Sequence, residues 1–333
     1  MMKTILILIT LLLFGCQKSK ESKNELTIYT YDAFSSKWGP APKIKEIFEK
    51  EHNCTLNFIG VSSSIGALRK IELEGDKTKA DILLGLDSST ISLAKKSNLF
   101  EKLPFEYKDK IDLPLTFSDK YFIPFDYSYF AFVYDKNRVK NPPHSFEELC
   151  DMPKDFKIAI QDPRSSTAGF GLLLWVKSIY KDRAKDYWKR LAPHILTITK
   201  GWSESYNLFL KHEVDMSLSY TTSPAYHMIA EHKDNIKAAK FLEGHYLQIE
   251  VAGFLKSSKH KKLAIEFLKF LYSKEFANII PTTNWAYPVI KTELPKEFDT
   301  LIKPKKPLFL ELNYVNKNTK AIIDEWLEAI KSR

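Results

Sequence analysis

The chain has 333 residues, of which 44% are hydrophobic and 13% aromatic, and its formal net charge is +9. This length predicts about two domains, and the apolar content argues against a disordered chain. The Lys and Arg residues are dispersed along the sequence, without a concentrated basic stripe or a known nucleic-acid-binding motif, so a nucleic-acid partner is not expected.

The first 16 residues have the layout of a signal peptide. Lys3 precedes ten apolar or small residues, 5–14, and this run is too short to span a bilayer as a stable helix. The ending Leu-Phe-Gly-Cys at 13–16 resembles a bacterial lipoprotein signal. The resemblance implies that Cys16 is acylated and becomes the mature N-terminus. An ordinary cleaved signal, or an anchor that happens to end in Cys, is the alternative.

Residues 17–25 contain no apolar side chain and are predicted to form a flexible tether. Two or more acyl chains hold a protein firmly at a membrane, whereas one does not. We therefore expect the globular part to be exported and to work on the periplasmic side of a bacterial membrane, held there by its lipid.

The segment from 26 to 86 alternates between strand and helix patterns. Ser62–Ser64 offer an N-cap to the second helix, and Gly75 ends it. The order β-α-β-α-β predicts a parallel sheet covered by helices. The predicted strands are 26–31, 54–61 and 80–86, and the predicted helices are 39–53 and 62–75.

The same alternation restarts in the second half, so that the chain is expected to form two parallel sheets, one on each side of a long aromatic segment. The long aromatic segment 122–135 and a second crossing near 244–257 would join two α/β lobes as hinge strands. Ligands of open α/β sheets bind at the carboxyl ends of the strands, and two facing lobes can trap a small molecule by closing. We assign 26–124 and 250–333 to the first lobe and 125–249 to the second. The strands expected in the second lobe are 131–135 with its flank, 157–162, 194–199 and 215–220, and the helices are 169–180 and 203–213.

Aromatic and hydroxyl side chains, rather than His or Cys, recur where the predicted strands end. An aromatic ring attracts a flat cation by about 0.5–2 kcal/mol per contact. A helix start at 164–171, with its N–H groups and hydroxyls, can hold an anion or an alcohol. A ligand with a flat cationic end and a hydroxyl or phosphate end would suit both features. The side chains at these strand ends are Tyr31, Trp38, Ser166, Thr167, Trp202, Tyr220, Tyr226 and, in the proline-bounded loop 279–290, Trp285.

Eight blocks of the sequence closely resemble the thiamine-binding proteins of bacterial ABC importers. The resemblance extends from about residue 26 to residue 290 and implies a type II periplasmic-binding-protein fold. It also implies a monomeric, non-enzymatic protein without cofactor or metal, which captures thiamine or its mono- and diphosphate and delivers it to a membrane permease with its ATPase. The blocks are YTYDAFSSKWGPAP, ADILLGLD, PFDYSYFAFVYDKN, QDPRSSTAGFGLLLW, TKGWSESYNLFL, LSYTTSPAYH, EGHYLQIEVA and IPTTNWAYPV.

Carried over residue by residue, the resemblance implies a set of ligand contacts and one departure from the family. Family members carry an acidic residue in the loop after the second strand, where this chain has Ser63 and Ser64. Either cation–π contacts suffice, or Asp32 or Asp87 compensates, or the preference shifts toward a phosphorylated or altered thiamine. The implied contacts are Tyr31, Trp38, Ser63, Ser64, Ser166, Thr167, Trp202, Tyr220, Thr221, Thr222, Ser223, Tyr226 and Trp285.

Two other classes stay open as alternatives. A thiaminase-like enzyme on the same fold would use a nucleophilic cysteine, but no base or positive charge is visibly paired with Cys54 or Cys150. A ferric-ion-binding protein of the same superfamily would use adjacent tyrosines with His or Glu, whereas a proline turn separates Tyr220 from Tyr226. Export would permit a disulfide between Cys54 and Cys150, and two free thiols are the alternative.

Overall fold

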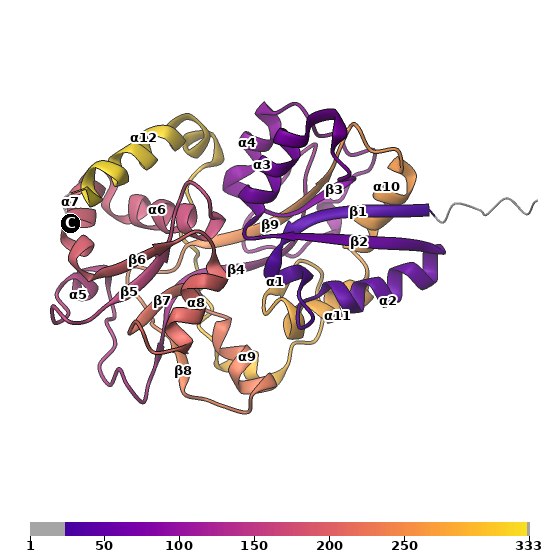
Figure 1. Ribbon diagram of the computed structural model, residues 1–333. Helices are drawn as coiled ribbons and strands as arrows, with labels where there is room; N and C mark the ends of the chain where they lie inside the picture. The colour runs from indigo at the N-terminus through magenta and orange to yellow at the C-terminus, as the bar shows by residue number, and fades with distance from the viewer. Residues whose placement is uncertain (1–23, 332–333) are drawn as a thin grey trace, which may run out of the picture.

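The computed structural model describes residues 24–331 and consists of two α/β lobes side by side (Figure 1). Cys16 and the rest of the predicted signal peptide lie outside the described residues. β1 (Asn24–Tyr31) begins two residues earlier than predicted, inside the predicted tether. It does so because Asn24 and Glu25 pair in parallel with the first residues of β2 (Cys54–Val61).

The first lobe has the predicted β-α-β-α-β order. β1 lies between β2 and β3 (Ile82–Asp87), and the three strands are parallel. Ser63 accepts a hydrogen bond from the Gly66 N–H at 3.0 Å and caps the second long helix, which Gly75 ends with φ +53°. Both helix boundaries agree with the prediction. The helices of this lobe are α1 (Asp32–Ser35), α2 (Ala41–His52), α3 (Ser64–Glu74) and α4 (Ile91–Lys96).

The second lobe is built around β5 (Ile158–Gln161), which is parallel to both β6 (Ile195–Thr199) and β7 (Met216–Tyr220). These strands and the two helices predicted between them are confirmed. The short β8 (Ile236–Ala238) pairs with the end of β4 (Ile123–Asp135). The helices are α5 (Phe146–Cys150), α6 (Thr167–Tyr180), α7 (Ala184–Leu191), α8 (Trp202–Leu210) and α9 (Ser223–Ala230).

Two long antiparallel strands, β4 and β9 (Leu247–Phe254), pass from one lobe to the other (Figure 1). The first half of β4 pairs with β9, whose other edge pairs with β3, and the second half of β4 pairs with β7. The strands therefore follow one path, β2-β1-β3-β9-β4-β7-β5-β6. Each lobe has the expected parallel strands, and the hinge strands β4 and β9 pair antiparallel with them and join them into one continuous sheet.

The C-terminal helix differs from the predicted division into lobes. α10 (Lys261–Phe270), α11 (Lys274–Thr283) and β10 (Tyr287–Pro288) return to the first lobe. α12 (Leu312–Ile330) instead lies over α6 and α7 of the second lobe (Figure 1). Val315, Ile322 and Trp326 are buried in the apolar core of that lobe. The assignment of 250–333 to the first lobe is therefore wrong for α12, and the chain crosses between the lobes a third time.

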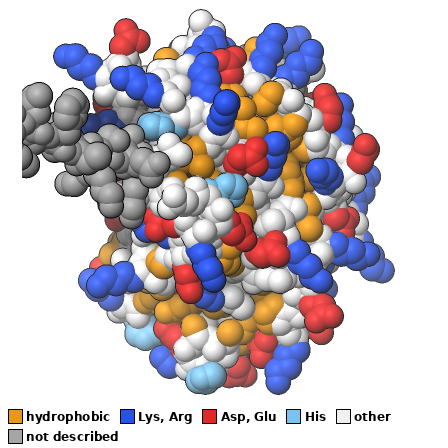
Figure 2. Space-filling model, turned by 90° about the vertical axis from the view of Figure 1, so that its right-hand side faces the viewer, with side chains coloured by type: hydrophobic (Ala, Val, Ile, Leu, Met, Phe, Trp, Pro, Cys, Tyr) orange, Lys and Arg blue, Asp and Glu red, His pale blue; other side chains and the backbone are white. Residues whose placement is uncertain are grey.

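The surface carries its positive charge in dispersed form. Figure 2 shows Lys and Arg side chains scattered over one face, interspersed with acidic and apolar ones. No helix within residues 24–331 is both long and apolar enough to cross a membrane.

Candidate functional site

A cavity of about 460 Å³ lies between the lobes, at the carboxyl ends of β1 and β7 and beside the hinge strands β4 and β9. Its lining contains aromatic, hydroxyl and carboxyl side chains, and none of the described Lys, Arg or His residues belongs to it. The residues expected from the sequence that line it are Tyr31, Trp38, Ser63, Ser64, Ser166, Thr167, Trp202, Tyr220, Ser223, Tyr226 and Trp285.

Thr221 and Thr222, which were also expected to contact a ligand, do not line the cavity. Both are buried, and the Thr222 hydroxyl lies 2.9 Å from the Ser128 hydroxyl of β4. The turn between β7 and α9 directs them into the protein, and the next hydroxyl, Ser223, faces the cavity in their place. Ser128 also lines the cavity and was not anticipated.

One wall of the cavity is made by Trp202 at the start of α8. Its ring stacks on Tyr206, one turn later, with centroids 4.6 Å apart and an interplanar angle of 25°. The indole N–H donates to the Ser219 hydroxyl of β7 at 2.9 Å. Stacking and the hydrogen bond together hold the ring in one orientation, so that it offers a preformed flat face.

The opposite lobe contributes Trp285, which meets Tyr226 of α9 edge to face, with ring centroids 5.3 Å apart. Trp285 has φ +56°, a left-handed backbone conformation that is uncommon for an aromatic residue. Its indole nitrogen is buried and has no hydrogen-bond partner within the described part of the chain. Strain of this kind often marks a functional position. The segment before it was expected to be a loop, but α11 continues through Pro281 to Thr283.

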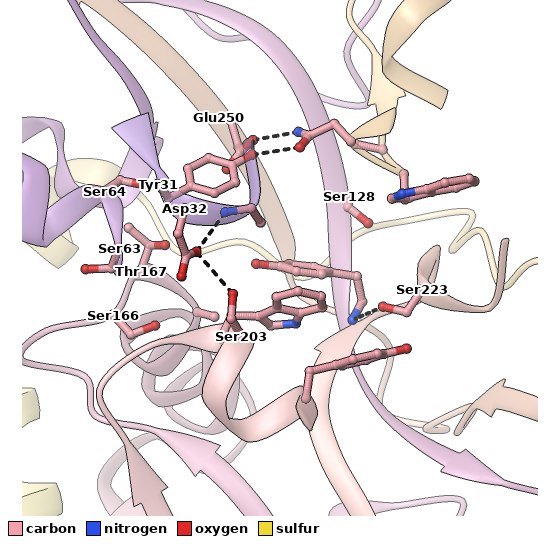
Figure 3. A pocket seen from close by; sticks show the side chains of 18 of the residues that line it. Tyr31, Asp32, Ser63, Ser64, Ser128, Ser166, Thr167, Ser203, Ser223 and Glu250 are labelled. Carbon is pink, nitrogen blue, oxygen red and sulfur yellow. Dashed lines mark hydrogen bonds between the residues drawn. The ribbon is translucent and has the colours of Figure 1, made fainter. Parts of the chain in front are cut away.

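Hydroxyl groups gather where two helices begin. Ser63 and Ser64 stand at the start of α3 in the first lobe, and Ser166 and Thr167 at the start of α6 in the second (Figure 3). The Ser63 hydroxyl donates to the Ser165 carbonyl oxygen and so connects the lobes directly. Helix starts present free N–H groups and a partial positive charge. This corner of the cavity is therefore suited to a hydroxyl or an anionic oxygen.

The cavity also contains an acid pair, Asp126 of β4 and Glu250 of β9, which was not anticipated. The Asn284 amide donates to Asp126 Oδ2 at 2.6 Å and to Glu250 Oε2 at 3.1 Å. The Tyr31 hydroxyl lies 2.8 Å from the same Glu250 oxygen (Figure 3). Burial raises the pKa of Asp126 to about 7, and burial together with the charge of Asp126 raises the pKa of Glu250 well above its usual range.

Of the two acids expected to replace the missing carboxylate, only Asp32 lines the cavity. It lies at the start of α1 and accepts a hydrogen bond from the Ser203 hydroxyl of the second lobe at 3.1 Å (Figure 3). Desolvation raises its pKa. Asp87 is buried away from the lining, accepts a hydrogen bond from the Ser89 N–H at 2.7 Å, and has its pKa raised to about 6 by burial.

The two described cysteines are free and neither lines the cavity. Desolvation raises the pKa of both thiols, that of Cys150 to about 12, so neither is a thiolate near neutral pH. Residues 24–331 contain no group of three His, Cys, Asp or Glu side chains that could hold a metal ion.

Residues 31–278 match the family model for bacterial extracellular solute-binding proteins. The chain is 46% identical to the thiamine-binding periplasmic protein of Escherichia coli strain K12 over 319 residues, 96% of this chain and 97% of the relative. A solved periplasmic thiamin-binding protein matches with 47% identity and a TM-score of 0.90, covering 93% of this chain and 97% of the other. The apo ferric ion-binding protein A of Pasteurella haemolytica, at 18% identity and a TM-score of 0.75 over 92% and 98% of the two chains, shares the fold alone.

Proposed function

Because the chain belongs to the family of bacterial extracellular solute-binding proteins, we propose that it captures thiamine, free or phosphorylated, outside the cytoplasmic membrane and delivers it to an ABC permease and its ATPase. The relatives at 46–47% identity are thiamine-binding periplasmic proteins, which supports this ligand. The two-lobe fold, with hinge strands behind a cavity, is suited to a protein that closes around a small molecule.

The charge of the cavity is the observation that carries the choice of ligand. Asp32, Asp126 and Glu250 line it, and no basic side chain among residues 24–331 lines it beside them. A buried carboxylate without a cationic partner is costly, so a cation is the ligand class that this cavity favours. The thiazolium ring of thiamine is flat and positively charged, which also suits the faces of Trp202 and Tyr226.

The hydroxyl corner would hold the other end of the ligand. Ser166 and Thr167 stand at the first turn of α6, where N–H groups lack partners within the helix. Ser63 and Ser64 occupy the same position on α3. We assign this corner to the hydroxyethyl group or the phosphates of the ligand. Its hydroxyls and helix starts favour oxygen atoms, and no Lys or Arg among the described residues lines the cavity.

The remaining assignments belong to the same proposal. Cys16 would carry the lipid that keeps the protein at the membrane, and the chain would act as a monomer without cofactor. A thiaminase-like reaction would need an activated cysteine, and a ferric site would need a cluster of hard ligands. The raised thiol pKa of Cys150 and the cavity lining do not favour either.

The test is native mass spectrometry of the protein purified from cells under mild conditions. The proposal predicts an added mass equal to thiamine, its monophosphate or its diphosphate, lost when the lobes are unfolded and restored by adding thiamine. A retained compound of another class, with no exchange for added thiamine, would overturn it.

A further inference from the structure

Asp126 and Glu250 form an acid pair to which no Lys, Arg or His of residues 24–331 provides a counter-ion. Their exposed fractions are 1% and 8%, and they lie on the adjacent hinge strands β4 and β9. Two neutral groups donate side-chain hydrogen bonds to them: the Asn284 amide donates to both carboxyls, and the Tyr31 hydroxyl donates to Glu250. Asp126 Oδ1 is buried and has no hydrogen-bond partner in the part of the chain that the structure describes.

Two adjacent buried carboxyls cannot both carry a full charge at little cost. Each charge raises the cost of the other, and low polarity around them increases this effect. Such a pair keeps a proton that either group alone would lose, and the two groups titrate together. The raised pKa values of both groups agree with this expectation.

We infer that Asp126 and Glu250 share a proton in the unliganded protein and release it to solvent when a cationic ligand enters the cavity, so that the pair selects for positive charge. The inference rests on the proposed function. The ligand's positive charge takes the place of the proton, and the net charge of the site is therefore unchanged by binding. A neutral molecule of the same shape would leave the proton in place and gain no such attraction.

The groups around the pair do not supply the proton themselves. Tyr31 of β1 and Tyr220 of β7 face the pair, and burial, together with the charges of the pair, raises the pKa of both phenols well above their usual range. The negative charge of Asp87, at the end of β3, also raises the pKa of Tyr220. The amides of Asn284, after α11, and Gln248 of β9 do not ionise. Tyr287 of β10 stacks on Tyr127 and does not line the cavity. The exchangeable proton therefore belongs to the acid pair.

Calorimetric titration with thiamine, in three buffers of different ionisation enthalpy at one pH, measures protons released per ligand bound. For the full chain at pH 7 we expect roughly half to one proton released, which corresponds to a threefold to tenfold rise in affinity per pH unit. The double variant Asp126→Asn/Glu250→Gln keeps size and hydrogen-bonding capacity. It should release no proton and bind with an affinity that does not change with pH.

Asp32→Asn is the matched control, because Asp32 lines the same cavity but is not part of the pair. Its affinity should fall, while its proton release stays that of the parent.

Thiamine binding by the parent with no dependence on buffer would overturn this inference and leave the proposed function intact. Parent-like proton release by the double variant would overturn it too. Absence of thiamine binding in every buffer would overturn the proposed function instead. The parent measurement decides by itself if the double variant does not fold.

Discussion

Gly201 lies so close to Ser62 that a Cβ atom on the glycine would stand 2.4 Å from the Ser62 carbonyl oxygen. Gly201 caps α8 in the second lobe, and Ser62 precedes α3 in the first, so the two backbones meet across the mouth of the cavity. Gly201 has φ −145°, which any residue can adopt. The glycine is therefore needed for the approach of the lobes and not for the local backbone.

Gly201→Ala should hinder closure without unfolding either lobe. We expect thiamine affinity to fall by roughly 1–3 kcal/mol, the usual cost of overpacking, with little change in the unfolding temperature of the unliganded protein. Small-angle scattering should show a larger radius of gyration at saturating thiamine than for the parent. The exposed neighbour Lys200→Ala is the control and should behave like the parent. Parent-like binding by Gly201→Ala would show that this contact does not limit closure.

The aromatic wall should carry a large share of the binding energy. Trp202→Ala, Tyr226→Ala and Trp285→Ala should each weaken thiamine binding by roughly 1–3 kcal/mol, from lost buried area and lost cation–π attraction. Trp285→Leu should recover the apolar part only. Tyr314 on α12 is 40% exposed and does not line the cavity, so Tyr314→Ala is the control. Calorimetric titration measures all five variants, and unchanged affinity for the three Ala variants would rule out this cavity.

Restoring an acid at the start of α3 should discriminate between the ligand's charge states. In Ser63→Asp the hydroxyl that donates to the Ser165 carbonyl oxygen is lost, and a negative charge stands beside the hydroxyl corner. Repulsion should weaken binding of thiamine diphosphate more than binding of thiamine, to an extent that salt reduces. The ratio of the two dissociation constants, from competition titrations at low and high salt, is the readout. An unchanged ratio would place the phosphates elsewhere.

The unliganded protein should lose stability as pH rises. The folded-state pKa of Asp126, about 7, lies above its unfolded value, so its favourable contribution is complete below the unfolded pKa and is lost as pH rises through the folded pKa. Glu250 shifts in the same direction. Urea unfolding between pH 5 and pH 8 should therefore show a declining free energy of unfolding, by the order of a few kcal/mol. Asp126→Asn/Glu250→Gln should flatten the profile, whereas an equal slope in that variant would assign the effect to other groups.

Lipidation can be checked at Cys16, which lies outside the described residues. Cys16→Ser should accumulate as unprocessed precursor, because the acceptor thiol is absent, while the parent fractionates with membranes. A soluble parent protein whose N-terminus maps to another residue would contradict the lipoprotein assignment.

The strands and helices, and most of the cavity lining, could be predicted because they depend on local patterns. Tyr31 ends β1 in the first lobe and Trp202 follows β6 in the second, and each was predicted from the rule that ligands of open α/β sheets bind at the carboxyl ends of the strands. Asp126 and Glu250 were not predicted as site residues. They lie inside mostly apolar strands, where their own charge is the one feature that distinguishes them from their neighbours. A single acid in such a run is a usable signal, since burial without a partner is costly.

The position of α12 shows a different limit. Its apolar face, with Val315, Ile322 and Trp326, indicates that the helix is buried on one side. The same face could cover either lobe, and only the contacts with α6 and α7 decide between them. Thr221 and Thr222 illustrate the same limit at a turn. Both are buried away from the cavity, whereas the next residue, Ser223, lines it.

Calorimetric titration of the full chain with thiamine tests the central claim most directly. The account predicts saturable binding at one site per chain, strengthened as pH rises through the titration of the acid pair and weakened in Trp202→Ala but not in Tyr314→Ala. Absence of binding, or binding that is indifferent to both Trp202 and pH, would contradict it.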